Sequence, residues 1–403
     1  MNERQHVSDW ASDFDHLSEE WAARSPEILA DLRQNCPVAH TERFHGAYLV
    51  SRYEDISEVA HNEAIFSSRI TSVNDNHPDN IKLELPPITL DPPEHAPIRR
   101  ALLPAFNPRE VANLEPFVVE VVARLLDDLE GRALVDGALD FAQLVPVEVM
   151  IRLFGVSPEM GPQFRLWVDA MLKDGQVDLD VARKANREIQ AYFADQLQQR
   201  RHTPANDLVT LVLNAQAASP DGTSRPFSER ERIGALFVLM LGGIDTTWSS
   251  LGAALFHLGT HPEDLATLVE RPELIPTAIE EFLRFYSPVI IARLITEDAE
   301  VAGCPVKAGE RLLLAFPSAN RDVDHFDRPD EVVIDRQHNR HVAFGVGVHR
   351  CLGSNLARME LRVALEGWVG RFPRFELAVD PEDITWSVGP VRGPRLVPLR
   401  ILT

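Results

Sequence analysis

The chain has 403 residues, of which 45% are hydrophobic and 25% are charged, the composition of an ordinary globular protein. Its 40 basic and 61 acidic residues leave a net charge of −21, which argues against nucleic acid and anionic membranes as partners. The three cysteines, Cys36, Cys304 and Cys351, lie too far apart in the sequence for a disulfide framework, and they favour a reducing, cytoplasmic location.

The predicted elements of the N-terminal half are mostly helices. Residues 1–17 are polar and acidic, so we expect neither a signal peptide nor a membrane anchor. A short apolar run predicts a strand at residues 47–50. Prolines and acids behind capping residues predict helices that start near residues 91–94, 107–110 and 157–159. Residues 217–227 contain two prolines and a glycine, which predict a surface loop.

A long apolar helix is predicted at residues 233–259, behind a capping box formed by Ser228 and Glu231. Its only charged residue is Asp245, and a carboxylate at the centre of a membrane span costs at least ~2.5 kcal/mol, so we expect a helix buried inside the protein. Gly242 and Gly243 each cost about 1 kcal/mol in a helix interior. Residues that weaken the element they lie in are typical of functional sites, although a helix-packing contact through glycine explains these two equally well from the residues alone.

The C-terminal part combines short strands with irregular segments. A helix is predicted to start at residues 261–263, and strands are predicted at 291–296, 310–315 and 395–401. Glu281 and Arg284 lie on one face of a predicted helix, where a solvated surface pair is the default interpretation. Residues 316–340 are polar and irregular, and their length suggests a function.

The most informative feature is the string FGVGVHRCLG at residues 344–353, which precedes a predicted helix at 352–369. A thiol at a helix N-terminus is biased towards the thiolate, and glycines let the backbone approach a flat, bulky group. Cys351 is therefore a candidate nucleophile or metal ligand. A zinc site is one alternative, and its ligands would be His338, His341, His349 and Cys351. Their spacing is irregular, and such a site gives Phe344 and Gly345 no role.

This string resembles the haem-binding loop of the cytochrome P450 family, F-G-x-G-x-H/R-x-C-x-G. Residues 242–247 are similar to that family's (A/G)-G-x-D/E-T motif, and E-x-x-R at 281–284 and H-x-x-x-R at 95–99 match two more motifs. The resemblance implies one mainly α-helical domain with minor β-structure over residues 1–403, with haem b between the long central helix and the helix that follows the cysteine loop. Its helix-rich core would span about residues 91–375, and its smaller β-containing part is expected at 38–90, 291–315 and 376–403.

The resemblance also implies a role for each matching residue. Cys351 is expected to be the axial iron ligand, within a binding loop that includes Phe344, Gly345 and Gly353. Gly242 and Gly243 would leave room for dioxygen, while Asp245 and Thr246 would relay protons. The expected partners of the haem propionates are His95, Arg99, Arg293 and His349. The expected structural ion network consists of Glu281, Arg284 and Arg336.

The implied reaction inserts one atom of O2 into a small, largely apolar organic substrate by hydroxylation or O/N-dealkylation. The expected substrate-pocket residues are Leu83, Ile88, Trp167, Met171, Val238, Leu241, Val289, Ile291 and Val391. Electrons are expected from a separate [2Fe–2S] or similar ferredoxin with its NAD(P)H-dependent reductase, docked on the basic residues Arg99, Arg100, Arg109, Arg340, Arg350 and Arg358. We expect a monomer that binds neither nucleic acid nor membrane. The alternatives are a haem-thiolate peroxygenase, which usually lacks the acid–threonine pair, and a non-enzymatic haem-binding sensor, which does not need that pair.

Overall fold

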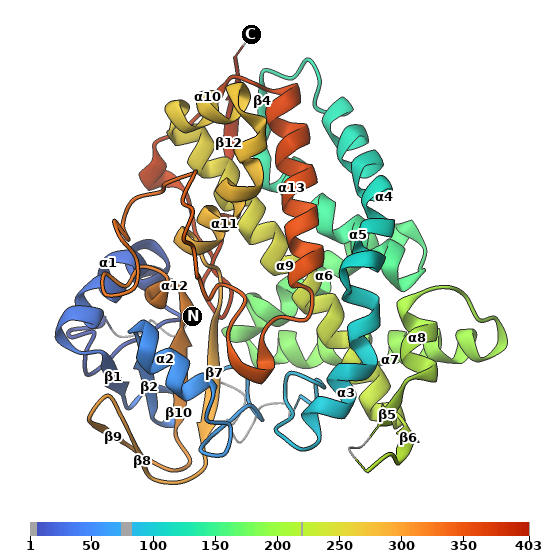
Figure 1. The fold of residues 1–403 in the computed structure, drawn as a ribbon, viewed down its shortest axis with the longest axis vertical. Coiled ribbons are helices and arrows are strands. Elements are labelled where there is room, and N and C mark those ends of the chain that lie inside the picture. The colour runs from blue at the N-terminus through green and yellow to red at the C-terminus, as the bar shows by residue number, and fades with distance from the viewer. Residues whose placement is uncertain (1–5, 74–82, 219–220, 403) are drawn as a thin grey trace.

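Helices form most of the protein in the computed structural model, which describes residues 6–73, 83–218 and 221–402 (Figure 1). The helices are α1 (Glu19–Asn35), α2 (Tyr53–Ala60), α3 (His95–Leu102), α4 (Pro108–Asp127), α5 (Leu144–Phe154), α6 (Gly161–Leu172), α7 (Leu179–His202), α8 (Leu208–Asn214), α9 (Glu229–Thr260), α10 (Pro262–Glu270), α11 (Ile275–Phe285), α12 (Phe316–Ala319) and α13 (Ser354–Arg371). The strands are β1 (Val38–Thr41), β2 (Ala47–Val50), β3 (Phe66–Ser67), β4 (Leu134–Asp136), β5 (Gln216–Ala218), β6 (Ser224–Pro226), β7 (Ile290–Ile295), β8 (Ala299–Val301), β9 (Cys304–Val306), β10 (Arg311–Ala315), β11 (Phe375–Leu377) and β12 (Pro398–Ile401).

Helix α9 is the centre of the helical part. It begins at the predicted capping box, where the Ser228 side chain accepts a hydrogen bond from the Glu231 amide at 3.2 Å and the Glu231 carboxylate accepts one from the Ser228 amide at 2.7 Å. Helices α5, α6, α7 and α13 pack around it. Among the described residues, α9 alone is long and apolar enough to cross a membrane, but 67% of its most apolar window is buried inside the protein.

A five-stranded sheet lies beside the helices, in the order β1-β2-β10-β7-β3 (Figure 1). Strand β7 pairs antiparallel with β10, with Ala292 opposite Leu313. Because successive side chains of a strand point to opposite faces, Ile291 and Arg293 share the face that Ala292 does not. The sheet thus supplies one apolar and one cationic side chain to the same side. A second sheet, β11-β12-β4, joins the C-terminal end to the segment before α5.

Most of the predicted elements are confirmed, and one is wrong. Strand β2 has the predicted bounds, and the Asn107 side chain caps α4 by accepting hydrogen bonds from two amides. The predicted loop at residues 217–227 instead contains a hairpin, because β5 pairs with β6 around the turn. Two shifts are smaller: α3 begins at His95, after two prolines, and the last strand, β12, begins three residues later than predicted.

Candidate active site

The cysteine loop is a tight turn held by its own backbone. The Cys351 amide donates a hydrogen bond to the Phe344 carbonyl at 2.8 Å. Gly345 and Gly347 have φ values of 68° and 71°, which disfavour residues with a side chain. A Cβ atom on Gly347 would lie 2.4 Å from the Ala60 carbonyl oxygen, so this glycine is also required for packing. The loop therefore presents the Cys351 thiol in one orientation, towards a cavity.

The thiol of Cys351 is open to this cavity but enclosed by the surrounding protein. Burial raises the pKa of the thiol, while the Gly353 amide and the guanidinium groups of Arg99 and Arg350 oppose that rise. A metal ion coordinated by a thiol removes its proton outright. The site thus suits a thiolate that is formed by metal binding.

Helix α9 forms another part of the cavity wall. Gly242, Gly243 and Thr246 line it. A Cβ atom on Gly242 would meet no atom within 4 Å, whereas one on Gly243 would lie 2.6 Å from the Met150 sulfur. The Thr246 hydroxyl donates a hydrogen bond to the Gly242 carbonyl at 2.7 Å. Gly242 therefore leaves open space beside the threonine hydroxyl, and Gly243 is a packing contact with α5.

Arg99, Arg293 and His349 line one part of the cavity, and the ring of His95 lies beside that of His349. The rings of His95 and His349 lie 4.3 Å apart, and the Nε2 atoms of both are buried with no partner among the described residues. Burial lowers the pKa of His95 to about 4 and that of Arg293 to about 10. The nearby carboxylate of Asp91 already accepts hydrogen bonds from two serines.

This arrangement fits a haem group. Buried donors without acceptors are costly, and two propionate carboxylates would satisfy them. Cys351 and the α9 residues Gly242, Gly243 and Thr246 line this same space. When bound, haem b supplies the activation of dioxygen, and the residues that would hold it are Cys351, His95, Arg99, Arg293 and His349.

The cavity encloses about 370 Å³. Of the predicted substrate residues, the structure brings eight to its wall: Leu83, Ile88, Met171, Val238, Leu241, Val289, Ile291 and Val391. Trp167 does not line it, because its indole lies between α6 and α7 and donates a hydrogen bond to Glu188 at 2.9 Å. Several wall residues were not predicted, including Leu85, Met150, Gln176, Ser250 and Glu360.

The Glu281 carboxylate organises the segment that precedes the cysteine loop. It accepts hydrogen bonds from Arg284 at 2.7 and 2.8 Å and from Arg336 at 2.9 Å. The Val333 amide is a further donor to it at 2.8 Å. Arg284 in turn donates to three carbonyls of residues 320–331, at 2.7 to 2.8 Å. The side chains of Glu281 and Arg284 are fully buried, so the irregular segment is fixed by an internal ion network rather than by regular structure.

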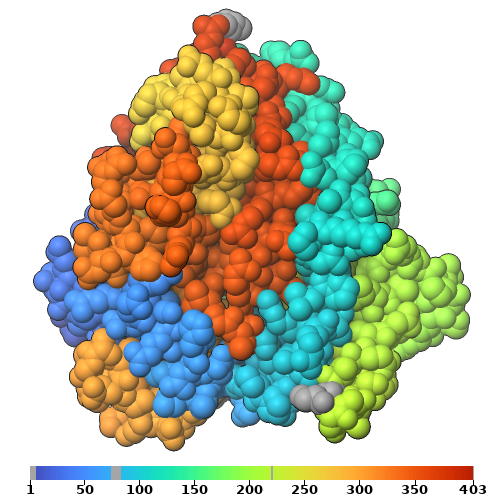
Figure 2. All heavy atoms as spheres, in the orientation of Figure 1, coloured from blue at the N-terminus to red at the C-terminus, as the bar shows by residue number. Residues whose placement is uncertain are grey.

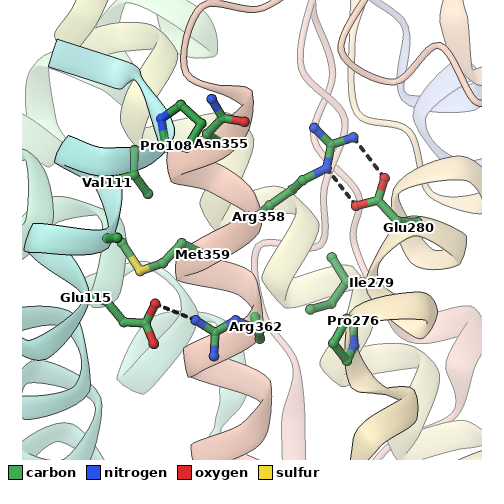
Figure 3. A pocket seen from close by; sticks show the side chains of 11 residues that line it. Pro108, Val111, Glu115, Pro276, Ile279, Glu280, Asn355, Arg358, Met359 and Arg362 are labelled. Carbon is green, nitrogen blue, oxygen red and sulfur yellow. Dashed lines mark hydrogen bonds and ion pairs between the residues drawn. The ribbon is translucent and has the colours of Figure 1, made fainter. Parts of the chain in front are cut away.

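A groove of about 320 Å³ lies beside this network, between α4, α11 and α13. In the space-filling view α13 (red) fills the trough between α4 (cyan) and the yellow α10–α11 segment (Figure 2). Ion pairs line the groove: Arg358 binds both oxygens of Glu280 at 2.7 and 2.8 Å, and Arg362 contacts Glu115 at 2.6 Å (Figure 3). The Arg358 guanidinium also lies 4.4 Å from the centre of the Phe344 ring. The groove is thus coupled to the cysteine loop.

The zinc alternative has no geometric support. No group of three histidine, cysteine, aspartate or glutamate side chains in the described part of the chain could hold a metal ion. His341 instead contacts Glu280 at 3.0 Å, while the ring of His349 packs at a tilt against that of His95. The histidines near Cys351 therefore serve different partners.

Comparisons with known proteins agree with this geometry. A family model described as Cytochrome P450 matches residues 148–388. Nocardicin C N-oxygenase of Nocardia uniformis subsp. tsuyamanensis is 35% identical over 92% of this chain and 94% of its own length. The polyketide biosynthesis cytochrome P450 PksS of Bacillus subtilis (strain 168) is 32% identical over 89% and 91%. The solved structure of cytochrome P450 CYP109Q5 from Chondromyces apiculatus is 31% identical, with a TM-score of 0.86 over 98% of this chain and 99% of that one.

Such enzymes hold haem b on a cysteine thiolate, which favours cleavage of the O–O bond. They act on an organic substrate with dioxygen and take electrons from a redox partner. The family model matches more than half of this chain, and a relative that aligns with 92% of it is named as an oxygenase. The chain therefore belongs to the cytochrome P450 family and is a haem-dependent monooxygenase.

Proposed function

We propose that this monooxygenase inserts one oxygen atom into a small, largely apolar organic substrate, by hydroxylation or O/N-dealkylation. The observation that carries the proposal is the chemistry of the cavity wall. The eight predicted substrate residues that line it all have aliphatic or thioether side chains. The haem would occupy the part of the cavity beside Cys351 and Gly353, so a substrate would occupy the remainder. An apolar wall favours a substrate that buries hydrocarbon surface.

Asp245 and Thr246 are proposed to deliver the protons that the reaction consumes. The Thr246 hydroxyl lies at the cavity wall beside the open space at Gly242, where dioxygen would bind. Asp245 precedes it on α9 and is buried, so it is not on the cavity wall itself. A general acid at such a position contributes about 10²- to 10⁴-fold to a rate. Substitution of either residue should therefore slow turnover without loss of the haem.

We propose that electrons arrive from a ferredoxin that docks on the cysteine face. Arg109, Arg340 and Arg350 are exposed there and could attract an acidic partner despite the net negative charge. Arg358 is a poorer docking candidate than its position in the sequence suggests, because Glu280 already neutralises it. Charge reversal at Arg109 should slow reduction by ferredoxin and leave substrate binding unchanged. Reversal at Arg400, a surface residue paired with Glu376, is the control.

An absorption spectrum tests the proposed ligation and a screen tests the proposed substrate class. The reduced, carbon-monoxide-bound protein should show the Soret band of thiolate-ligated haem, and Cys351→Ala should remove it. Apolar compounds should convert the iron from low to high spin, because they displace water from the cavity. If only charged or strongly polar compounds produce this shift, the proposed substrate class is wrong.

The cell compartment we propose is the cytoplasm, and fractionation would test it.

A further inference from the structure

The acid of the α9 groove has a partner from the other end of the chain. One Arg395 nitrogen, Nη1, lies 2.5 Å from one oxygen of Asp245, and Nη2 lies 3.3 Å from the other. Only 1% of the Asp245 side chain and 13% of the Arg395 side chain are exposed. A carboxylate buried to this extent is stable only when a cation and hydrogen bonds compensate for lost hydration. Arg395 supplies both.

Arg395 is itself held in place by α9. Its guanidinium lies 4.3 Å from the centre of the Trp248 ring, within range of a cation–π contact. Its amide donates a hydrogen bond to the Thr385 carbonyl at 3.2 Å. Arg395 is therefore held at both its backbone and its guanidinium, and its two contacts to Asp245 fix the position of that carboxylate.

The backbone that carries Arg395 is packed closely against the same helix. A Cβ atom on Gly393 would lie 2.4 Å from Ser249, one helical turn beyond Asp245. The Gly393 amide donates to the Ser387 hydroxyl at 3.0 Å, and that hydroxyl donates to the Val391 carbonyl at 2.8 Å. Val391 lines the cavity. One ordered turn thus connects the cavity wall to the partner of the acid.

A second acid, Asp169, is influenced by the charges of this pair. Asp169 on α6 is partly buried, and burial raises its pKa. The charge of Arg395 acts against that rise, and the charge of Asp245 adds to it, so the three groups share one electrostatic environment.

We propose that Arg395 is a positioning residue for proton delivery, which holds the Asp245 carboxylate aligned on α9 between successive proton transfers. In each transfer Asp245 accepts a proton from the solvent side and passes one to the Thr246 hydroxyl, so the carboxylate is restored. The electrons come from the redox partner and not from this cluster. The inference rests on the proposed role of Asp245 and Thr246, and it adds a residue outside the motif that identified them.

The test uses four variants of the haem-loaded enzyme, without an organic substrate. Arg395→Gln removes the cation, Arg395→Lys keeps a positive charge, and Gly393→Ala displaces the turn while both charges remain. Asp245→Asn removes the acid. Matched controls are Arg400→Gln, from an exposed ion pair, and Gly370→Ala, where a Cβ meets no atom within 4 Å. Haem ligation is checked in each by the carbon-monoxide spectrum.

Oxidation of NADPH is driven by a plant-type [2Fe–2S] ferredoxin and its reductase, in H2O and in D2O. Asp245→Asn should slow it by about 10²-fold with a larger solvent isotope effect. Arg395→Gln and Gly393→Ala should change rate and isotope effect in the same direction, by about 10-fold in rate, because misplacing a catalytic group by a fraction of an ångström has effects of that order. Arg395→Lys should have a rate and isotope effect closer to those of the parent enzyme. Both controls should have the rate and isotope effect of the parent enzyme.

A second measurement is independent of turnover. In urea unfolding, Arg395→Gln should destabilise the enzyme less when Asp245→Asn is also present, since the buried carboxylate is then gone. If Asp245→Asn leaves the rate and isotope effect unchanged, the proposed role of the acid fails. If Asp245→Asn changes them while Arg395→Gln and Gly393→Ala do not, or if the two substitutions are additive in unfolding, the positioning role of Arg395 is wrong and that of Asp245 stands.

Discussion

Replacement of Glu281 by glutamine tests whether the buried network holds the cysteine loop. Glu281 accepts hydrogen bonds from Arg284, from Arg336 and from the Val333 amide, and both it and Arg284 are fully buried. A glutamine keeps the shape but carries no charge, so two guanidinium groups lose their anion. Breaking a buried ion pair on one side costs about 3–5 kcal/mol, a large part of the 5–15 kcal/mol that is usual for a folded protein.

The control is Glu273→Gln, because Glu273 forms an exposed pair with Arg271 at 3.4 Å. Exposed pairs contribute about 0–1 kcal/mol. Urea unfolding followed by circular dichroism, and haem release followed by the Soret band, should both show a much larger effect for Glu281→Gln. Equal free energies of unfolding for the two variants would show that the network is not what stabilises the loop.

Four further variants test other parts of the site. Burial raises the pKa of Glu360 well above its usual range, so the folded protein favours the neutral acid. Glu360→Gln should therefore raise the free energy of unfolding at neutral pH. This gain should vanish below about pH 4, where the carboxyl of the unfolded chain is also protonated. Burial alone would raise the pKa of Glu280, but Arg358 and His341 lower it to about 2. The stability that Glu280 contributes should therefore be complete above about pH 5 and lost as the pH falls towards 2. In urea titrations Glu280→Gln should abolish this acid dependence. Gly242→Ala should keep or raise stability by up to about 1 kcal/mol yet slow oxygen consumption, whereas Gly243→Ala should lower stability through its clash with Met150, as thermal unfolding would measure.

The elements that the sequence predicted correctly are those specified by local chemistry. The capping box at Ser228, the Asn107 cap and the glycines around Cys351 each act within a few residues, so their spacing contains the information. The hairpin at residues 216–226 was missed because its strands are short and mostly exposed, and nothing in their composition separates them from a loop. Burial and pairing there depend on neighbouring elements.

The site residues divide in the same way. Motifs indicated Cys351 and Thr246, because the spacing itself is distinctive. The pair of Asp245 with Arg395 joins residues 150 positions apart, and nothing in the sequence around Arg395 marks it as a partner of α9. Trp167 was expected in the cavity because it lies on the right pair of helices, but only packing determines that its indole turns towards Glu188. Long-range contacts and side-chain direction are what the sequence does not encode locally.

The two walls of the cavity are supported in physically different ways, and this difference indicates where the enzyme tolerates change. The cysteine side depends on the fully buried charges of Glu281 and Arg284, which cannot be altered one at a time without leaving a charge unpaired. The substrate side consists of aliphatic contacts such as Leu241, Val289 and Val391, where exchanges of similar volume usually cost less than about 1.5 kcal/mol. Substrate preference can therefore change by substitution at these positions while the thiolate loop stays fixed. Val391 is the exception among them, because its carbonyl belongs to the turn that carries Arg395, so a new side chain there should alter proton delivery as well as substrate fit.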